Sequence, residues 1–193
     1  MLLAAERLLH APVMSLQTGG QLARTKAALI DPRNLMIIAF ELEGPALDQH
    51  PSYLLVTDVR ELSNIGLIVD SSDEFVGPDD VIKVQEVRDF NFELIDKLVE
   101  SERRQKLGKV TTYAVEPGSF MIKQLNVRRP LLKSFTDTEL LIDRSQVVEV
   151  NDTKIIIKND ERAPAHVKQA AGTFTNPFRG QPAQPESIKR SQP

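Results

Sequence analysis

The chain has 193 residues and no cysteine, 41% of its residues are hydrophobic, and its formal net charge is −3. The missing cysteines exclude disulfide bonds and thiolate chemistry and agree with a reducing compartment. The only apolar run near the N-terminus, MLLAA, is too short for a secretory signal or a membrane-spanning helix. We therefore expect a cytoplasmic protein with no membrane span.

The charge is unevenly distributed along the chain. The balance of basic and acidic residues is −6 for residues 1–85, 0 for residues 86–160 and +3 for residues 161–193. A protein that binds phosphate backbones is usually basic in its folded part. DNA is therefore not an expected partner, and RNA is not the leading one.

Short strands separated by turns dominate the first 85 residues. A helical turn is expected at residues 5–9, before Pro12, and a tight hairpin turn at Asp31 and Pro32. The expected strands cover residues 13–16, 22–30, 35–42, 53–57, 59–62 and 67–69. This pattern is typical of a closed or nearly closed β-barrel. An acidic loop is expected at residues 70–80, and residues 81–84 either close the barrel or lead into a linker.

The same pattern occurs a second time. Residues 22–45 align without a gap to residues 107–130, and five residues of the first stretch recur identically in the second: Leu22, Pro32, Met36, Ile37 and Pro45. Further strands are expected at residues 140–142, 147–150 and 155–157, where they correspond to the later strands of the first copy. A duplicated unit of this length is a small domain. We predict an all-β protein of two tandem barrels, at 1–85 and 86–160, followed by a flexible Pro/Gln-rich tail at 161–193.

The duplicated segments resemble the PRC-barrel family. The second-strand pattern of that family is similar to Lys106-Leu107-Gly108-Lys109-Val110 and, more weakly, to residues 21–25. The acidic residue followed by proline at the hairpin turn, and the closing strands at 58–69 and 144–157, resemble it as well. The resemblance implies small six-stranded barrels whose known members include the reaction-centre H subunit and part of a ribosome maturation factor. Both use the barrel for protein contacts, with no catalysis in it.

No residue pattern marks a catalytic or cofactor site. His10, His50 and His166 lie far apart in sequence, so no pair has metal-ligand spacing, and the chain has no nucleophile elbow and no phosphate-binding loop. Small barrels filled by side chains also leave little room for a pocket of catalytic size. We expect no enzyme activity, no metal and no cofactor.

Two charged surfaces are candidates for partner contact. The basic candidate lies beside turns of the second copy and contains Arg103, Arg104, Lys106, Lys109, Arg128, Arg129 and Lys133. The acidic candidate contains Asp70, Asp73, Glu74, Asp79 and Asp80, and it would face a basic partner rather than hold a cation. Ordinary solvated turns are the simpler explanation of both groups. Phe120 is expected in the core, whereas the place of Tyr113 stays open between core packing and stacking on a base.

These features predict a non-enzymatic adaptor or assembly module that binds another protein through barrel loops and hairpin faces. The alternative is an RNA- or ribosome-associated factor that uses the basic residues. The two aromatic residues in 174–179, within the predicted tail, could form a short docking motif.

Overall fold

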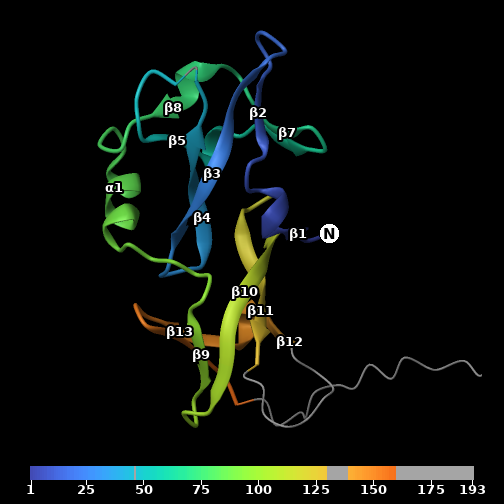
Figure 1. Ribbon diagram of the computed structural model, residues 1–193, viewed down its shortest axis with the longest axis vertical. Helices are drawn as coiled ribbons and strands as arrows, with labels where there is room; N and C mark the ends of the chain where they lie inside the picture. The colour runs from blue at the N-terminus through green and yellow to red at the C-terminus, as the bar shows by residue number, and fades with distance from the viewer. Residues whose placement is uncertain (46, 130–138, 160–193) are drawn as a thin grey trace, which may run out of the picture. The chain divides into compact units, whose positions relative to one another are not determined.

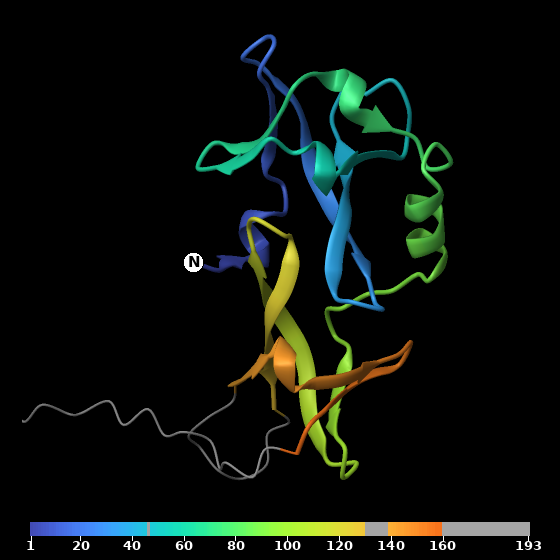
Figure 2. The ribbon, with the colours of Figure 1, turned by 180° about the vertical axis from the view of Figure 1, so that it is seen from behind.

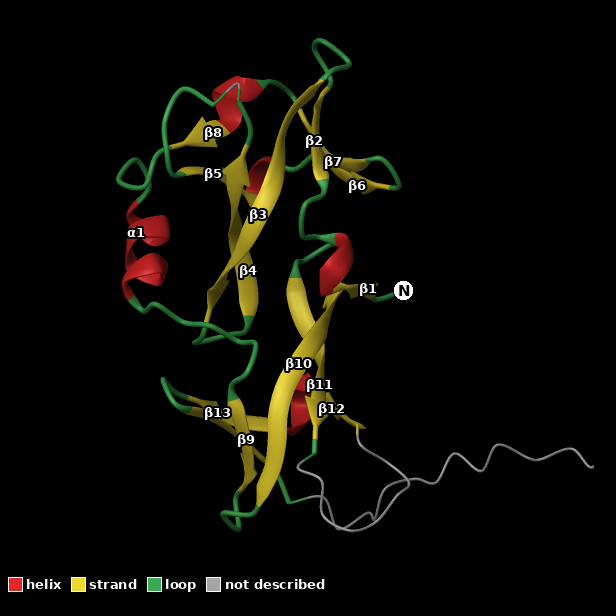
Figure 3. Cartoon of the chain, in the orientation of Figure 1, coloured by secondary structure: helices red, strands yellow, loops and turns green. Residues whose placement is uncertain are grey.

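The computed structural model describes residues 1–45, 47–129 and 139–159, which form mostly strands and one α-helix (Figures 1 and 3). The strands of the first half are β1 (Leu3–Ala4), β2 (Pro12–Ser15), β3 (Gln21–Asp31), β4 (Met36–Glu43), β5 (Ser52–Leu55), β6 (Glu61–Ser63), β7 (Gly66–Val69) and β8 (Phe75–Val76). Those of the second half are β9 (Leu98–Ser101), β10 (Lys106–Glu116), β11 (Met121–Arg128), β12 (Glu139–Asp143), β13 (Val147–Val150) and β14 (Lys154–Ile157). The helix is α1 (Ile82–Asp89), and the short 3₁₀ turns are η1 (Ala5–Arg7), η2 (Val56–Asp58), η3 (Ser72–Glu74) and η4 (Arg144–Gln146). The predicted tail, His166 and the aromatic residues of 174–179 lie outside the described residues.

The strand pairing of the first half recurs in the second half. In the first half, β3 lies antiparallel to β2 and β4, β4 also pairs with β5, and β2 runs parallel to β7, which pairs with β6. In the second half, β10 lies antiparallel to β9 and β11, β11 also pairs with β12, and β9 runs parallel to β14, which pairs with β13. The duplicated sequence therefore corresponds to a duplicated pairing pattern, and the prediction of a mainly β protein is confirmed.

The two halves are joined by a reciprocal pair of backbone hydrogen bonds. The amide of Ile37 donates to the carbonyl of Phe120 at 3.0 Å, and the amide of Ile122 donates to the carbonyl of Leu35 at 2.9 Å. Leu35 corresponds to Phe120, and Ile37 to Ile122, so the two bonds are equivalent under the duplication. Figure 2 shows the tip of the β10–β11 hairpin, in yellow, beside the blue strands of the first half. Buried side chains of both halves form a shared core, and residues 1–159 are one compact unit.

The helix α1 is the main element that the sequence did not predict. Residues 81–84, expected to end the barrel or begin a linker, instead lead into this helix, whose Val84 and Val87 are fully buried. They pack against Ile38 and Tyr53 of the first half. Valine favours strands by intrinsic preference, so the helix depends on tertiary packing rather than on propensity. The strand expected at residues 53–57 also ends earlier, because Val56 begins η2.

The helix α1 contains the predicted domain boundary between residues 85 and 86. It has eight residues, and no helix in the described ranges is long and apolar enough to cross a membrane.

The hairpin turn between β3 and β4 is held by a buried carboxylate. Asp31 is 2% exposed, and its Oδ1 accepts hydrogen bonds from the amide of Arg33 at 3.0 Å and from Arg33 Nε at 2.9 Å. Oδ2 accepts a third bond from Arg33 Nη2 at 2.8 Å. These bonds to Arg33 keep the pKa of Asp31 below its ordinary value, although burial opposes the shift.

Replacing Asp31 by asparagine is expected to destabilise the protein by about 1–3 kcal/mol at pH 7, because a charge-assisted network is lost. A carboxylate with a lowered folded-state pKa stabilises the fold above its unfolded pKa of about 4, and this contribution disappears as the pH falls through the folded-state value. Wild-type stability should therefore fall below about pH 4, and the Asp31→Asn variant should show a flatter acid dependence. Urea unfolding followed from pH 7 to pH 2 measures both effects.

The corresponding residue of the second copy provides a control for the Asp31→Asn substitution. Glu116 is the counterpart of Asp31 but is exposed, and its carboxylate bonds to the hydroxyl of Ser119 at 2.6 Å. Glu116→Gln should change stability and acid dependence less than Asp31→Asn. Equal effects of the two substitutions would contradict the role assigned to the buried carboxylate.

Candidate functional site

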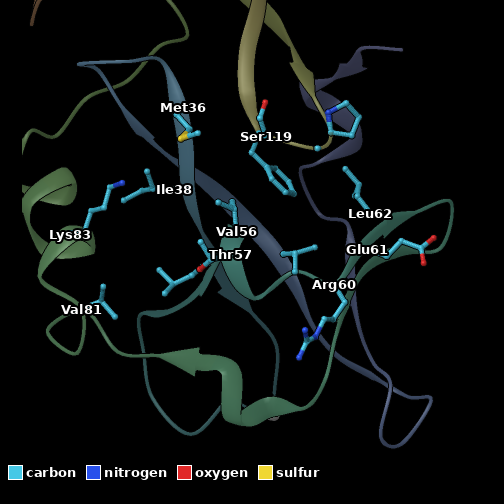
Figure 4. A pocket seen from close by; sticks show the side chains of 15 residues that line it. Met36, Ile38, Val56, Thr57, Arg60, Glu61, Leu62, Val81, Lys83 and Ser119 are labelled. Atoms are coloured by element: carbon cyan, nitrogen blue, oxygen red, sulfur yellow. The ribbon is translucent and has the colours of Figure 1, made fainter.

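A groove of about 720 Å³ lies between the tip of the β10–β11 hairpin, strand β4, the start of α1 and the segment from η2 to β6 (Figure 4). Most of its lining is apolar, and the side chains that form it come from both halves of the chain: Met36, Ile38, Leu55, Val56, Leu62 and Phe120. Its volume is within the range of ligand and side-chain pockets. The expectation that the fold leaves little room for a pocket is therefore wrong, because the groove lies between elements of the two halves rather than inside a barrel.

Two cationic side chains line the groove at different places. Arg60 precedes β6, and its guanidinium bonds to the Asp70 carboxylate, with Nε 3.0 Å from Oδ1. This contact lowers the pKa of Asp70 and raises the pKa of Arg60, so the charge of Arg60 is already balanced. Lys83, in the first turn of α1, is exposed and makes no ion pair within the described part of the chain. After Arg33, its charge contributes to lowering the pKa of Asp31.

Some apolar positions of the groove have charged counterparts in the second copy, while Arg60 has the apolar counterpart Val148. The pairing registers make Asp143 the counterpart of Leu55, because Ala39 pairs with Leu55 and the corresponding Gln124 pairs with Asp143. Arg144 is then the counterpart of Val56.

The counterpart of Ile38 is Lys123, so three apolar positions of the groove are charged in the second copy. Ile38 and Leu55 also pack with α1, which explains part of the difference. Val56, by contrast, packs on the main core and remains partly exposed to the groove.

The basic residues predicted from the sequence are only partly brought together. Lys109 on β10 and Arg128 on β11 are direct cross-strand neighbours, and Lys106 begins β10. Arg103 and Arg104 lie in the turn between β9 and β10. Lys106 is the first residue of β10, beside that turn as expected, and Arg128 is the last residue of β11, whereas Lys109 lies inside β10. Lys133 lies outside the described residues.

Carboxylates interrupt this basic group. Glu139 on β12 is the cross-strand neighbour of Arg128, and Glu100 on β9 is the neighbour of Lys106. Glu100 also accepts a hydrogen bond from Lys154 Nζ at 2.7 Å. Alternating signs reduce the positive potential that a phosphate backbone would meet.

Most of the predicted acidic residues have partners within the protein. Asp70 pairs with Arg60 as described, and Asp79 contacts Arg88 Nη2 at 3.4 Å. Asp80 Oδ2 accepts a hydrogen bond from the amide of Gly77 at 2.6 Å. Asp73 and Glu74 lie in η3, which begins after Ser71. Three of the five carboxylates therefore stabilise local structure, and only the remaining two are without an ion pair or a capping role among the described residues.

The two aromatic residues singled out in the sequence are both buried. Phe120 is 6% exposed, as predicted, and Tyr113 is 5% exposed, which decides its place in favour of the core. Burial raises the pKa of Tyr113 to about 12. His10 lies at the surface with Nδ1 2.9 Å from Glu43 Oε1, and the described residues contain no cluster of acidic and histidine side chains suited to a metal ion.

A scan against models of known protein families and a search of curated proteins both give no match. The groove is thus identified from geometry alone, and sequence reasoning missed Ile38, Val56 and Lys83 as its residues. A signal was present in the sequence for two of them, since Ile38 and Val56 have the charged counterparts Lys123 and Arg144 in the second copy. Reading it requires the strand register, because the offset between copies changes along the chain.

Proposed function

We propose that the chain is a non-enzymatic protein-binding module of the tandem PRC-barrel type, which binds a partner protein in the groove beside η2. The proposal rests on the difference between the residues that line the groove and their counterparts in the second copy. The second copy forms the same strand pairings with Lys123, Asp143 and Arg144 in place of three apolar residues. The pairing pattern itself therefore does not require an apolar surface at Val56.

The partner segment would combine apolar side chains with a carboxylate. Partly exposed apolar residues such as Met36, Val56 and Leu62 supply area that is removed from water on binding. Lys83 supplies the unpaired positive charge that orients an acidic side chain of the partner. The basic residues of the second copy also predict an RNA- or ribosome-associated role, but the interposed Glu100 and Glu139 make that proposal the weaker one.

Site-specific photo-crosslinking in living cells tests the groove. A photoreactive amino acid is placed at Thr57 in η2 and, as the matched control, at its counterpart Ser145 in η4, both of which are exposed. We expect a discrete protein adduct from Thr57 and none from Ser145. The adduct should be lost in the variant Val56→Arg, which introduces the residue type of the second copy, provided that the variant unfolds at an unchanged temperature.

Equal adducts at Thr57 and Ser145, an adduct that persists in Val56→Arg, or recovery of RNA instead of protein would each contradict the proposed function. Because Val56 is only partly buried, its replacement should leave the core intact.

A further inference from the structure

The described part of the chain provides the strand β12 with a partner on only one side. Within the described residues it pairs with β11 alone, whereas its counterpart β5 pairs with β4 on one side and with β8 on the other. In the first copy, β8 runs antiparallel to β5 and places Val76 beside Tyr53. The first copy thus shows that this strand position can accept a further antiparallel strand.

The outer face of β12 differs from that of β5 in exposure. The pairing registers make Leu141 the counterpart of Tyr53, because Leu125 pairs with Ile142 as Phe40 pairs with Leu54. Tyr53 is 4% exposed because α1 packs on it and β8 pairs beside it, whereas Leu141 is 57% exposed. A leucine at the centre of an unpaired edge is an apolar contact that an added strand would cover.

The charged residues on this face of β12 determine which kind of strand can pair with it. Alternate residues of a strand point to the same side, so Glu139 and Asp143 flank Leu141, and all three are exposed. Glu139 makes no ion pair with another described residue, although Arg128 is its cross-strand neighbour on β11. The Asp143 carboxylate caps η4 through hydrogen bonds from Ser145 and the amide of Gln146, and the Ser145 bonds and, to a lesser extent, the charge of Lys123 lower its pKa. An added strand would therefore meet negative, apolar and negative side chains in turn.

We infer that the outer edge of β12 accepts an extended segment of a partner protein as an added antiparallel strand, with basic residues on either side of an apolar one. The apolar side chain of this segment lies beside Leu141, as Val76 lies beside Tyr53. Its two basic side chains lie opposite Glu139 and Asp143, where opposite charges on neighbouring strands stabilise the pair.

A second copy of the chain does not fit this edge. Two β12 strands paired antiparallel about Leu141 would place Glu139 of each copy opposite Asp143 of the other, and like charges directly opposite are destabilising. The edge is therefore protected from self-association and remains open to a basic strand. This surface is independent of the groove, so either proposal can fail without the other.

Peptide binding to the full-length chain tests the inference. The probe is a labelled nine-residue peptide in which lysine, valine and lysine occupy alternate positions among threonines, and the matched control carries glutamate for both lysines. Fluorescence anisotropy at low salt should give at least about tenfold tighter binding of the lysine peptide. Hydrogen exchange at β12 amides should slow when it binds, while exchange at β13 stays unchanged.

Surface variants assign the binding to β12. Leu141→Ala should weaken binding roughly tenfold, and Glu139→Lys should remove the preference for the lysine peptide. Val148→Ala is the control, because Val148 is an exposed residue of β13 with a comparable exposure of 51%. No binding, equal binding of the two peptides, or exchange protection outside β12 would overturn the inference.

Discussion

Replacing Gly108 by alanine is expected to lower the free energy of unfolding by about 3 kcal/mol or more, because the substitution combines backbone strain with a steric clash. Gly108 has a φ of +147°, and an added Cβ would lie 2.1 Å from the carbonyl oxygen of Arg128 and 2.9 Å from Val127 Cγ1. Backbone atoms of β11 cannot move away without separating β10 from β11. Urea unfolding monitored by circular dichroism measures the loss.

Gly118→Ala is the control for this substitution. Gly118 lies in the turn between β10 and β11, and no atom lies within 4 Å of the position that its Cβ would take. Its replacement should change stability by less than about 0.5 kcal/mol, as is usual for surface sites. Equal unfolding midpoints for the two variants would contradict the close approach of β10 and β11 at Gly108.

The two copies differ in the position of a glycine where the long hairpin strands cross. The counterpart of Gly108 is Ala23, which is 2% exposed. In the first copy the nearby glycine is Gly44, which directly follows β4 and whose added Cβ would lie 3.4 Å from Ala23 Cα. Each copy therefore has a glycine at this crossing, within β10 in the second copy and directly after β4 in the first.

The hairpins could be predicted from the sequence because their signals are local. An acidic residue followed by proline lies between two apolar strands in both copies, and in the structure the amides of Leu35 and Phe120 bond back to the carbonyls of Asp31 and Glu116. Turn chemistry of this kind acts within a few residues. The duplication extended the hairpin prediction to the second copy, whereas the parallel pairings of β2 with β7 and of β9 with β14 were not predicted.

The helix α1 and the groove could not be predicted, because they depend on contacts between distant segments. Val84 and Val87 form a helical face only when Ile38 and Tyr53 lie against it. The groove likewise needs Val56 and Phe120, which are far apart in sequence, to line one space. Local pattern reasoning contains no information about which segments face each other across the fold.

Replacing Phe120 by alanine is expected to cost about 3–5 kcal/mol, the range found for truncation of buried aromatic residues. Phe120 is 6% exposed, and its ring meets the edge of Phe40 with centroids 5.9 Å apart and planes at 71°. Both the apolar burial and the aromatic pair are lost in the variant. The carbonyl of Phe120 also accepts the hydrogen bond from Ile37 that joins the halves, so disorder at this residue weakens that bond as well.

The matched control for this substitution is Phe120→Leu, which introduces the residue found at the corresponding position of the first copy. Leu35 and Phe120 share a φ of +54°, so the backbone strain is similar for phenylalanine, leucine and alanine and cancels in the comparison. Phe120→Leu should cost less than half as much as Phe120→Ala, since most of the side-chain volume is retained. Chemical denaturation of the two variants distinguishes these outcomes, and equal losses would mean that the strain at this position, not the packing of the ring on Phe40, sets the stability of the junction.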